Sequence, residues 1–236
     1  MTNMKPPLLL LGALASLYAN ANAAPAIDPA ATRLFERAAT VYGNAQTIAL
    51  DYRVTSDNAA VPAAEGGRIW WRKPKLYAQS WTYSAGRGHV AADEKQIYFT
   101  DVDGKSGRQS WKSEFGFWTS LPWPLPGNLE FLLRGQKIPM MNANVRSLPA
   151  QKLEGVWCDG ATLDLRRVNG DTIRFWFARK TGLLMRESWA VKLPESDEVA
   201  QVQTRYFNIR LNPKLERGDF VRANEEVAPL LLQPPA

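Results

Sequence analysis

The chain has 236 residues, 45% of them hydrophobic and nine of them tryptophan, which is enough apolar material for the core of one large domain or two small ones. Its 29 Lys and Arg exceed its 23 Asp and Glu, giving a net charge of +6, but the longest basic cluster is only Arg72-Lys73 with Lys75. A nucleic-acid-binding protein usually concentrates its charge in one patch or stripe. We therefore do not expect a nucleic acid partner; a solvated basic surface or an anionic partner such as lipid headgroups fits better.

The N-terminus has the three parts of a secretory signal peptide. Lys5 is followed by an apolar run from Leu8 to Leu17 and then by Ala21-Asn22-Ala23, which matches a small-residue cleavage motif. The run is too short to span a bilayer. We expect cleavage after Ala23, export to the periplasm, a single domain over residues 24–228 and a loose Pro-rich tail over residues 229–236. The single cysteine, Cys158, can form no internal disulfide and lies too far along the chain to be an N-terminal lipid anchor.

The first element expected in the exported chain is an amphipathic helix. Asp28-Pro29 supplies an N-cap residue and a proline at the first helical position. Apolar residues then recur at helical spacing up to Tyr42, and Gly43 is a plausible C-terminal stop.

After this helix the periodicity changes to two, and the stretch from Gly66 to Tyr83 shows it most clearly. Two aromatic-rich runs flank Lys73-Pro74, which is typical of adjacent strands. Strand alternation places Ile69 and Trp71 on one face and Trp70 on the other. Large aromatic residues on both faces need cover on both faces, so a second layer must lie over this sheet.

Further runs predict a mainly β protein of the α+β type. A loop over 57–67 separates the first strand from the second, and short strands flank the tetrapeptide Trp157-Cys158-Asp159-Gly160. The predicted strands are 48–54, 69–72, 76–83, 89–92, 96–101, 108–112, 153–156, 161–166, 172–179, 183–193 and 199–211. About ten strands at hairpin spacing, with no crossover helices between them, indicate an antiparallel meander.

Residues 115–135 differ from their surroundings because prolines at 122, 124 and 126 forbid regular structure in an unusually apolar segment. A short helix is expected near its end, from Leu129 to Leu133. Long structured loops are often lids, so this segment is either a mobile cover over an apolar cavity or a loop packed permanently on the core. The candidate lid residues are Trp118, Trp123, Phe131 and Leu132.

The sequence offers little for catalysis. His89 is the only histidine, so a multi-histidine metal site cannot form, and Cys158 has no nearby His or second Cys. No phosphate-binding glycine loop is present, and carboxylates such as Asp93 and Asp101 lie in predicted turns. We expect no enzyme activity, no metal and no cofactor, although a carboxylate pair could still assemble in space.

Five short segments together resemble the LolA-like family of periplasmic lipoprotein carriers, especially its uncharacterised periplasmic relatives. They are Ile27-Asp28-Pro29 before the helix, the strand, basic-Pro and strand block from Gly67 to Tyr77, the hairpin from Ala92 to Tyr98, the Gly-Val-x-Cys segment within Leu153–Asp159, and the closing motif from Leu211 to Phe220.

The resemblance implies an incomplete antiparallel β-barrel of about ten strands, wrapped around the N-terminal helix and a short lid helix, with an apolar cavity for acyl chains. In the carriers an arginine directly before the proline controls ligand release. Lys73 stands at that position here, preceded by Arg72, and Glu94 stands where the family hairpin has glycine. Lysine does not reproduce the planar hydrogen-bonding fork of arginine, so the sequence departs from the family at its switch.

These observations predict a monomeric, non-enzymatic periplasmic carrier for a lipid or a lipidated protein, with peripheral membrane contact. Arg72 and Lys73 are the candidate headgroup or switch site. The candidate cavity residues are Trp70, Trp71, Leu76, Tyr77, Trp81, Phe175 and Phe177, which could equally fill a core. The alternatives are a sensor or interaction domain that binds an envelope protein and, less favoured, an unrecognised hydrolase.

Overall fold

The protein is described here from a computed structural model. The structure describes residues 25–59, 66–73, 76–83, 86–92, 96–100, 104–110, 128–138, 140, 143–165, 172–193 and 198–215. The expected signal peptide, the Pro-rich tail and most of the expected lid segment lie outside these residues.

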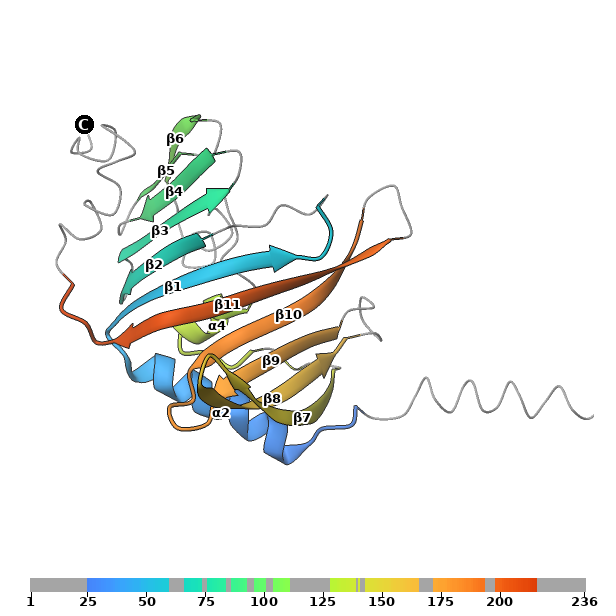
Figure 1. The fold of residues 1–236 in the computed structure, drawn as a ribbon. Helices are drawn as coiled ribbons and strands as arrows, with labels where there is room; N and C mark the ends of the chain where they lie inside the picture. Colours follow the sequence, from blue (N-terminus) through green and yellow to red (C-terminus); the bar gives the residue numbers. More distant parts are fainter. Residues whose placement is uncertain are drawn as a thin grey trace, which may run out of the picture.

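The described residues form one open antiparallel sheet with two helices on one side of it (Figure 1). The strand order is β6-β5-β4-β3-β2-β1-β11-β10-β9-β8-β7, so the sheet ends at β6 and β7 and is not a closed barrel. The strands are β1 (Thr47–Ser56), β2 (Gly66–Arg72), β3 (Leu76–Tyr83), β4 (Gly86–Ala92), β5 (Gln96–Thr100), β6 (Ser106–Ser110), β7 (Asn144–Leu153), β8 (Val156–Asp164), β9 (Thr172–Ala178), β10 (Leu184–Lys192) and β11 (Val199–Leu211). The predicted antiparallel, mainly β fold is confirmed, with eleven strands in place of about ten.

Helix α2 (Pro29–Asn44) starts where the sequence predicts. The Asp28 side chain accepts a hydrogen bond from the Ala30 backbone N–H at 2.7 Å, and Pro29 occupies the first turn. The predicted stop at Gly43 is wrong by one residue, because Gly43 is helical and the helix ends at Asn44. Gly43 instead allows a close approach: a Cβ added there would lie 3.3 Å from the Cα of Gly135.

The β7–β8 hairpin corrects a second prediction. The tetrapeptide Trp157–Gly160 does not separate two strands, since β8 runs through it from Val156. The chain turns at Glu154 and Gly155, which have φ angles of 48° and 87°, while Leu153 pairs with Val156. Two consecutive positive φ values define a tight hairpin turn whose twist matches that of the flanking strands. Strand β8 therefore begins at Val156, five residues before the predicted start at residue 161.

The pairing register shows which side chains share the face that the helices cover, which we call the inner face. One cross-strand row on it joins Ile48, Trp71, Tyr77, Ala92 and Ile97. All five are buried in the main hydrophobic core, together with residues of both helices. The opposite, outer face is the one turned toward the viewer in Figure 1, where α2 and the short helix α4 (Leu129–Leu133) lie behind the strands.

Glycines on the inner face are covered by aromatic side chains of neighbouring strands. A Cβ added to Gly67 would lie 2.2 Å from the Tyr52 ring, and one added to Gly88 would lie 2.4 Å from the Trp81 ring. Both pairs face each other directly in register. An aromatic ring placed over a cross-strand glycine restores the packing that glycine lacks, so these glycines mark packed positions of the sheet.

No helix among the described residues is long and apolar enough to cross a membrane.

Candidate functional site

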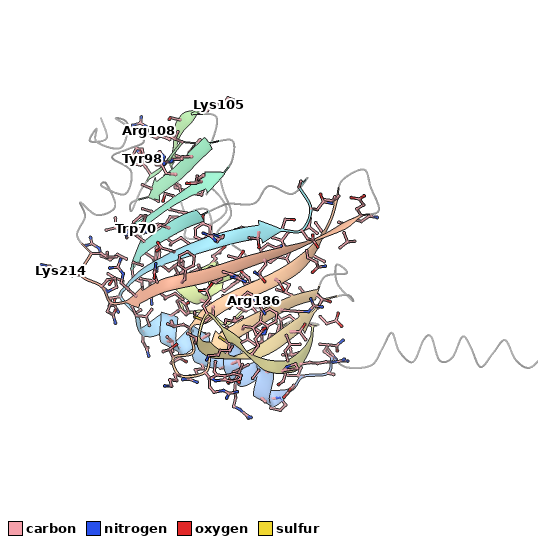
Figure 2. All side chains as sticks on the ribbon, viewed as in Figure 1. Trp70, Tyr98, Lys105, Arg108, Arg186 and Lys214 are labelled. Atoms are coloured by element: carbon pink, nitrogen blue, oxygen red, sulfur yellow. The ribbon has the colours of Figure 1, made fainter. Side chains whose placement is uncertain are left out.

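The sheet divides the seven candidate cavity residues between its two faces. Trp71, Tyr77, Trp81, Phe175 and Phe177 face the helices and are buried in the core. Trp70 lies on the outer face, where it pairs with Ala49 and Ala78 and where the Arg68 guanidinium sits 5.5 Å from its ring (Figure 2). Leu76 pairs with Arg72 on that same outer face. Five of the seven residues therefore lie on the face that the helices cover, and Trp70 and Leu76 lie on the opposite face.

Helix α2 covers one half of the inner face through a cluster of three phenylalanines. The Phe35 ring meets Phe175 edge-on at 5.2 Å between centroids and Phe177 at 5.4 Å, with interplanar angles near perpendicular at 82° and 80°. All three side chains are fully or almost fully buried. Edge-to-face aromatic pairs stabilise beyond the area they bury, so α2 is a firmly attached layer.

Helix α4 covers the middle of the inner face and contains the two candidate lid residues that the structure describes. Leu132 is fully buried, as are Leu129 and Leu133, while Phe131 is half-buried against the core. Trp118 and Trp123 lie outside the described residues. Gly135 follows the helix with a φ of 68°, and a Cβ added to it would lie 2.8 Å from the Gly43 Cα. Two glycines thus bring the ends of α2 and α4 into backbone contact.

A buried carboxylate joins the start of α4 to the sheet. Glu187 on β10 accepts hydrogen bonds from the Asn128 backbone N–H at 3.1 Å and from the Asn128 side-chain amide at 3.2 Å. Its other oxygen accepts a hydrogen bond from the Tyr206 hydroxyl. Burial raises the pKa of Glu187 to about 7, although these hydrogen bonds oppose the shift.

A second set of buried, hydrogen-bonded side chains lies on β1 and β3. The Tyr77 hydroxyl donates to the Gln79 side-chain oxygen at 2.5 Å, and the Gln79 amide donates to the Tyr52 hydroxyl at 2.7 Å. Burial raises the pKa of Tyr77 well above its usual value. Together with Glu187 and Tyr206, these groups give the centre of an otherwise apolar face a line of hydrogen-bonding positions.

The candidate switch residue Lys73 binds the C-terminal end of α2. Its Nζ donates to the carbonyl oxygens of Gly43 at 2.5 Å and Tyr42 at 3.3 Å. A cation at the C-terminus of a helix satisfies open carbonyl groups and interacts favourably with the helix dipole. Burial lowers the pKa of Lys73. Arg72 lies on the outer face, with its guanidinium 3.4 Å from the Leu215 carbonyl oxygen.

We expect replacement of Lys73 by methionine to lower the free energy of unfolding by about 1 kcal/mol, because two helix-end carbonyls lose their donor. Lys152→Met is the matched control, since Lys152 is exposed on β7. Thermal unfolding followed by circular dichroism measures the stability of both variants. Equal midpoints for the two variants would contradict a capping role for Lys73.

Within the described residues, His89, Cys158 and Glu187 do not come together as a set of catalytic side chains. His89 is fully buried, its two ring nitrogens have no hydrogen-bond partner there, and burial lowers its pKa to about 4. Cys158 is also buried, which raises the pKa of its thiol. No cluster of three metal-ligating side chains occurs in this part of the chain. Glu187 is bonded to Asn128 and Tyr206 within the core and does not open into a cleft.

The Glu187 contact was not predicted from the sequence. Glu187 and Trp189 are two residues apart on one strand, so their side chains point to the same face of the sheet. A carboxylate on the same face as a large apolar residue was the feature of the sequence that could have indicated this contact. Its partner Asn128 lies 59 residues away, a separation that no local pattern bridges.

Several solved structures are similar to this chain, all at low sequence identity. The Mycobacterium tuberculosis lipoprotein LppX aligns with 80% of this chain and 98% of its own, at 14% identity and a TM-score of 0.49. The protein MucB aligns with 82% of this chain and 62% of its own, at 12% identity and a TM-score of 0.47. A LolA superfamily protein from Nitrosomonas europaea aligns with 80% of this chain and 96% of its own, at 8% identity and a TM-score of 0.35. No protein-family model and no curated protein sequence matches the chain.

Proposed function

We propose that this protein is a periplasmic binding or carrier protein that holds the acyl chains of a lipid or a lipidated protein between its sheet and its helices. The observation that carries the proposal is the cover of the inner face. That face is largely apolar, and among the residues that the structure describes its middle is covered by the five-residue helix α4. Displacing so short an element exposes a mainly apolar surface with a few hydrogen-bonding groups, which suits an acyl chain and its polar end.

The attachment of α4 is consistent with a cover that can move. Its three leucines are buried, but its polar attachment to the sheet runs through Asn128 and Glu187, whose carboxyl group has a pKa near 7. Helix α2, with Phe35 between Phe175 and Phe177, would remain as the fixed layer. An acyl chain would then replace the leucines of α4 against Trp71, Tyr77 and Trp81.

Native mass spectrometry of the protein purified from the periplasm under gentle conditions, followed by solvent extraction, tests the proposal. We expect a retained mass that extracts as lipid, and uptake of a fluorescent fatty acid by the delipidated protein. An apo mass together with no uptake of the fatty acid would refute the carrier function.

A matched pair of leucine variants tests the cover. We expect Leu132→Ala in α4 to speed uptake of the fluorescent fatty acid several-fold, because it weakens the packing that ligand entry must break. Leu34→Ala removes the same side chain from α2, where Leu34 is partly buried against the core, and should leave the uptake rate within about twofold of wild type. Equal acceleration by both variants would show that general loosening, and not α4, controls entry.

A further inference from the structure

Two bulges lie on neighbouring strands in the middle of the sheet, β10 and β11 (Figure 1). On β11, Asn208 and Ile209 together face a single residue of β1, Leu50. On β10, Met185 is the extra residue, since the residues on both sides of it keep their partners on β9. A bulge bends its strand, increases the local twist and re-aims the side chains beside it. Two adjacent bulges therefore hollow the surface of the sheet at this point.

Two hollows adjoin these bulges on the outer face, and Asn208 and Ile209 line both of them. The larger has a volume of about 550 Å³ and lies between the β7–β8 turn, the β9–β10 turn and β11. The smaller has a volume of about 380 Å³ and lies on the other side of β11, against β1 and β2. Because the hollows share two residues, they form one recess across β11, which we call the β11 recess. The apolar side chains of its larger part are those of Val156, Trp157, Leu183, Met185, Phe207 and Ile209.

The larger part of the β11 recess exposes apolar surface. Trp157 is 54% exposed and Val156 is 38% exposed, and they are two of the four large apolar side chains that are exposed in the described part of the chain. Exposed apolar side chains that gather in a concave region mark binding sites. Small-molecule sites have volumes of roughly 300–1,000 Å³ and mainly apolar walls with a few polar groups. This part of the recess has the size and the chemistry to hold an apolar group of one or two rings.

The smaller, polar part of the recess carries more positive than negative charge. Arg68 binds Asp51 with 2.5 Å between Nε and Oδ1, and the Asn208 side chain donates to the same carboxylate at 2.8 Å. Burial alone would raise the pKa of Asp51, but these hydrogen bonds and the charges of Arg68 and Arg210 lower it. Two arginines therefore share one carboxylate. A positive charge remains in this part of the recess after both interactions are counted.

The rim of the apolar part has a similar excess of positive charge. Arg179 forms an ion pair with Asp159 at 2.6 Å, and at the adjoining turn Arg205 forms an ion pair with Glu154 at 3.2 Å. Lys180 adds another cation to the lining. Among the described residues of this rim, the cations therefore outnumber the carboxylates even though both arginines are paired.

We propose that the β11 recess binds a small amphipathic anion, with its ring group beside Trp157 and its carboxylate, phosphate or sulfonate group in the polar part beside Arg210. The net positive charge of a recess with apolar walls attracts an anion without breaking any of the ion pairs described above. The apolar walls supply affinity for the uncharged part of the same molecule. This site lies on the opposite face from the proposed acyl site and does not depend on it.

A pair of fluorescent probes that differ by one charged group tests the polar part of the recess. The anionic probe is 8-anilinonaphthalene-1-sulfonate, and the neutral probe, N-phenyl-1-naphthylamine, is the same molecule without the sulfonate. Monoolein, an uncharged lipid, is present throughout to occupy the proposed acyl site. We expect Arg210→Gln to weaken binding of the anionic probe at least about threefold and to leave binding of the neutral probe within about 1.5-fold. Arg33→Gln removes the same charge from the exposed side of α2 and should change neither.

A matched pair of valine variants tests the apolar part. We expect Val156→Ala to weaken binding of both probes about threefold, because it removes apolar surface from the wall of the hollow. Val199→Ala makes the same change at an exposed valine at the opposite end of β11 and should leave both affinities unchanged. Circular dichroism verifies that each variant folds. Equal effects of Arg210→Gln and Arg33→Gln on the anionic probe would overturn the proposal, as would displacement of that probe by monoolein. Failure of the acyl site would appear separately, as an absence of monoolein binding.

Discussion

Replacing Phe35 with alanine is expected to lower the free energy of unfolding by about 4 kcal/mol and the midpoint of thermal unfolding by roughly 10 °C. The side chain has no exposed surface, and its removal leaves a cavity bounded by Phe175 and Phe177. The loss combines the transfer free energy of the ring with the cost of a cavity that the rigid sheet cannot close. Two edge-to-face contacts disappear as well.

Urea denaturation followed by tryptophan fluorescence measures this loss, with Phe35→Leu as the control. Leucine keeps most of the buried volume and loses only the aromatic contacts, so its cost should be about 1 kcal/mol. A loss below about 1 kcal/mol for Phe35→Ala would contradict the assignment of α2 as a fixed layer of the core. The space that opens beside Phe175 would then belong to the ligand and not to the helix.

The fold could be predicted from local patterns because its strands alternate strongly and are joined in sequence order. Asp28-Pro29 marks the helix start, since a capping side chain and a proline act within one turn of the residue they specify. Strand β9 was predicted within one residue for the same reason. The β7–β8 turn was misplaced because Glu154-Gly155 lacks the Asn-Gly or Asp-Gly signature, although its backbone has the required positive φ angles.

The candidate site could be predicted only in part, because strand alternation separates two faces without showing which one the helices cover. Trp70 and Trp71 are chemically alike and adjacent, yet Trp71 is buried under the helices and Trp70 lies beside Arg68 on the outer face. The alignment of Arg53, Arg205 and Arg186 across β1, β11 and β10 was not predicted, because it depends on strand register and because β1 lies far in sequence from its partner β11. Bulges that shift register carry no signal that alternation alone can detect.

Two buried groups are expected to give this protein opposing dependences of stability on pH. The Glu187 pKa of about 7 lies above its ordinary value of 4.5, so between these values the native state holds a proton that the unfolded state has released. Stability therefore falls as pH rises through that window, by on the order of 3 kcal/mol. Among the described residues, the polar groups that face Glu187 are Asn128, Thr204, Tyr42 and Tyr206, and none of them titrates in this range.

His89 acts in the other direction. Its pKa of about 4 lies below its ordinary value of 6.5, so between these values the unfolded state binds a proton that the native state excludes. Stability therefore rises with pH across that window, by on the order of 3 kcal/mol. Its cross-strand neighbours Ser80 and Thr100 do not titrate. The two effects nearly cancel, and the stability of the wild-type protein should change by less than about 1 kcal/mol between pH 4.5 and 6.5.

Replacing either Glu187 or His89 should reveal the pH dependence of stability that the other residue causes. Glu187→Gln keeps an oxygen for the Asn128 donors and offers an amide to the Tyr206 hydroxyl, so it imitates the protonated acid, and its stability should rise with pH across the His89 window. His89→Leu should instead lose stability as pH rises through the Glu187 window. Urea denaturation at a series of pH values separates the contributions of the two residues. The stability of the double variant should change little with pH across these windows, because neither titrating group remains. If Glu187→Gln kept the wild-type profile, the Glu187 carboxyl would already be ionised in the folded protein, and α4 would be held to the sheet by a charged hydrogen bond at all pH values above about 4.5.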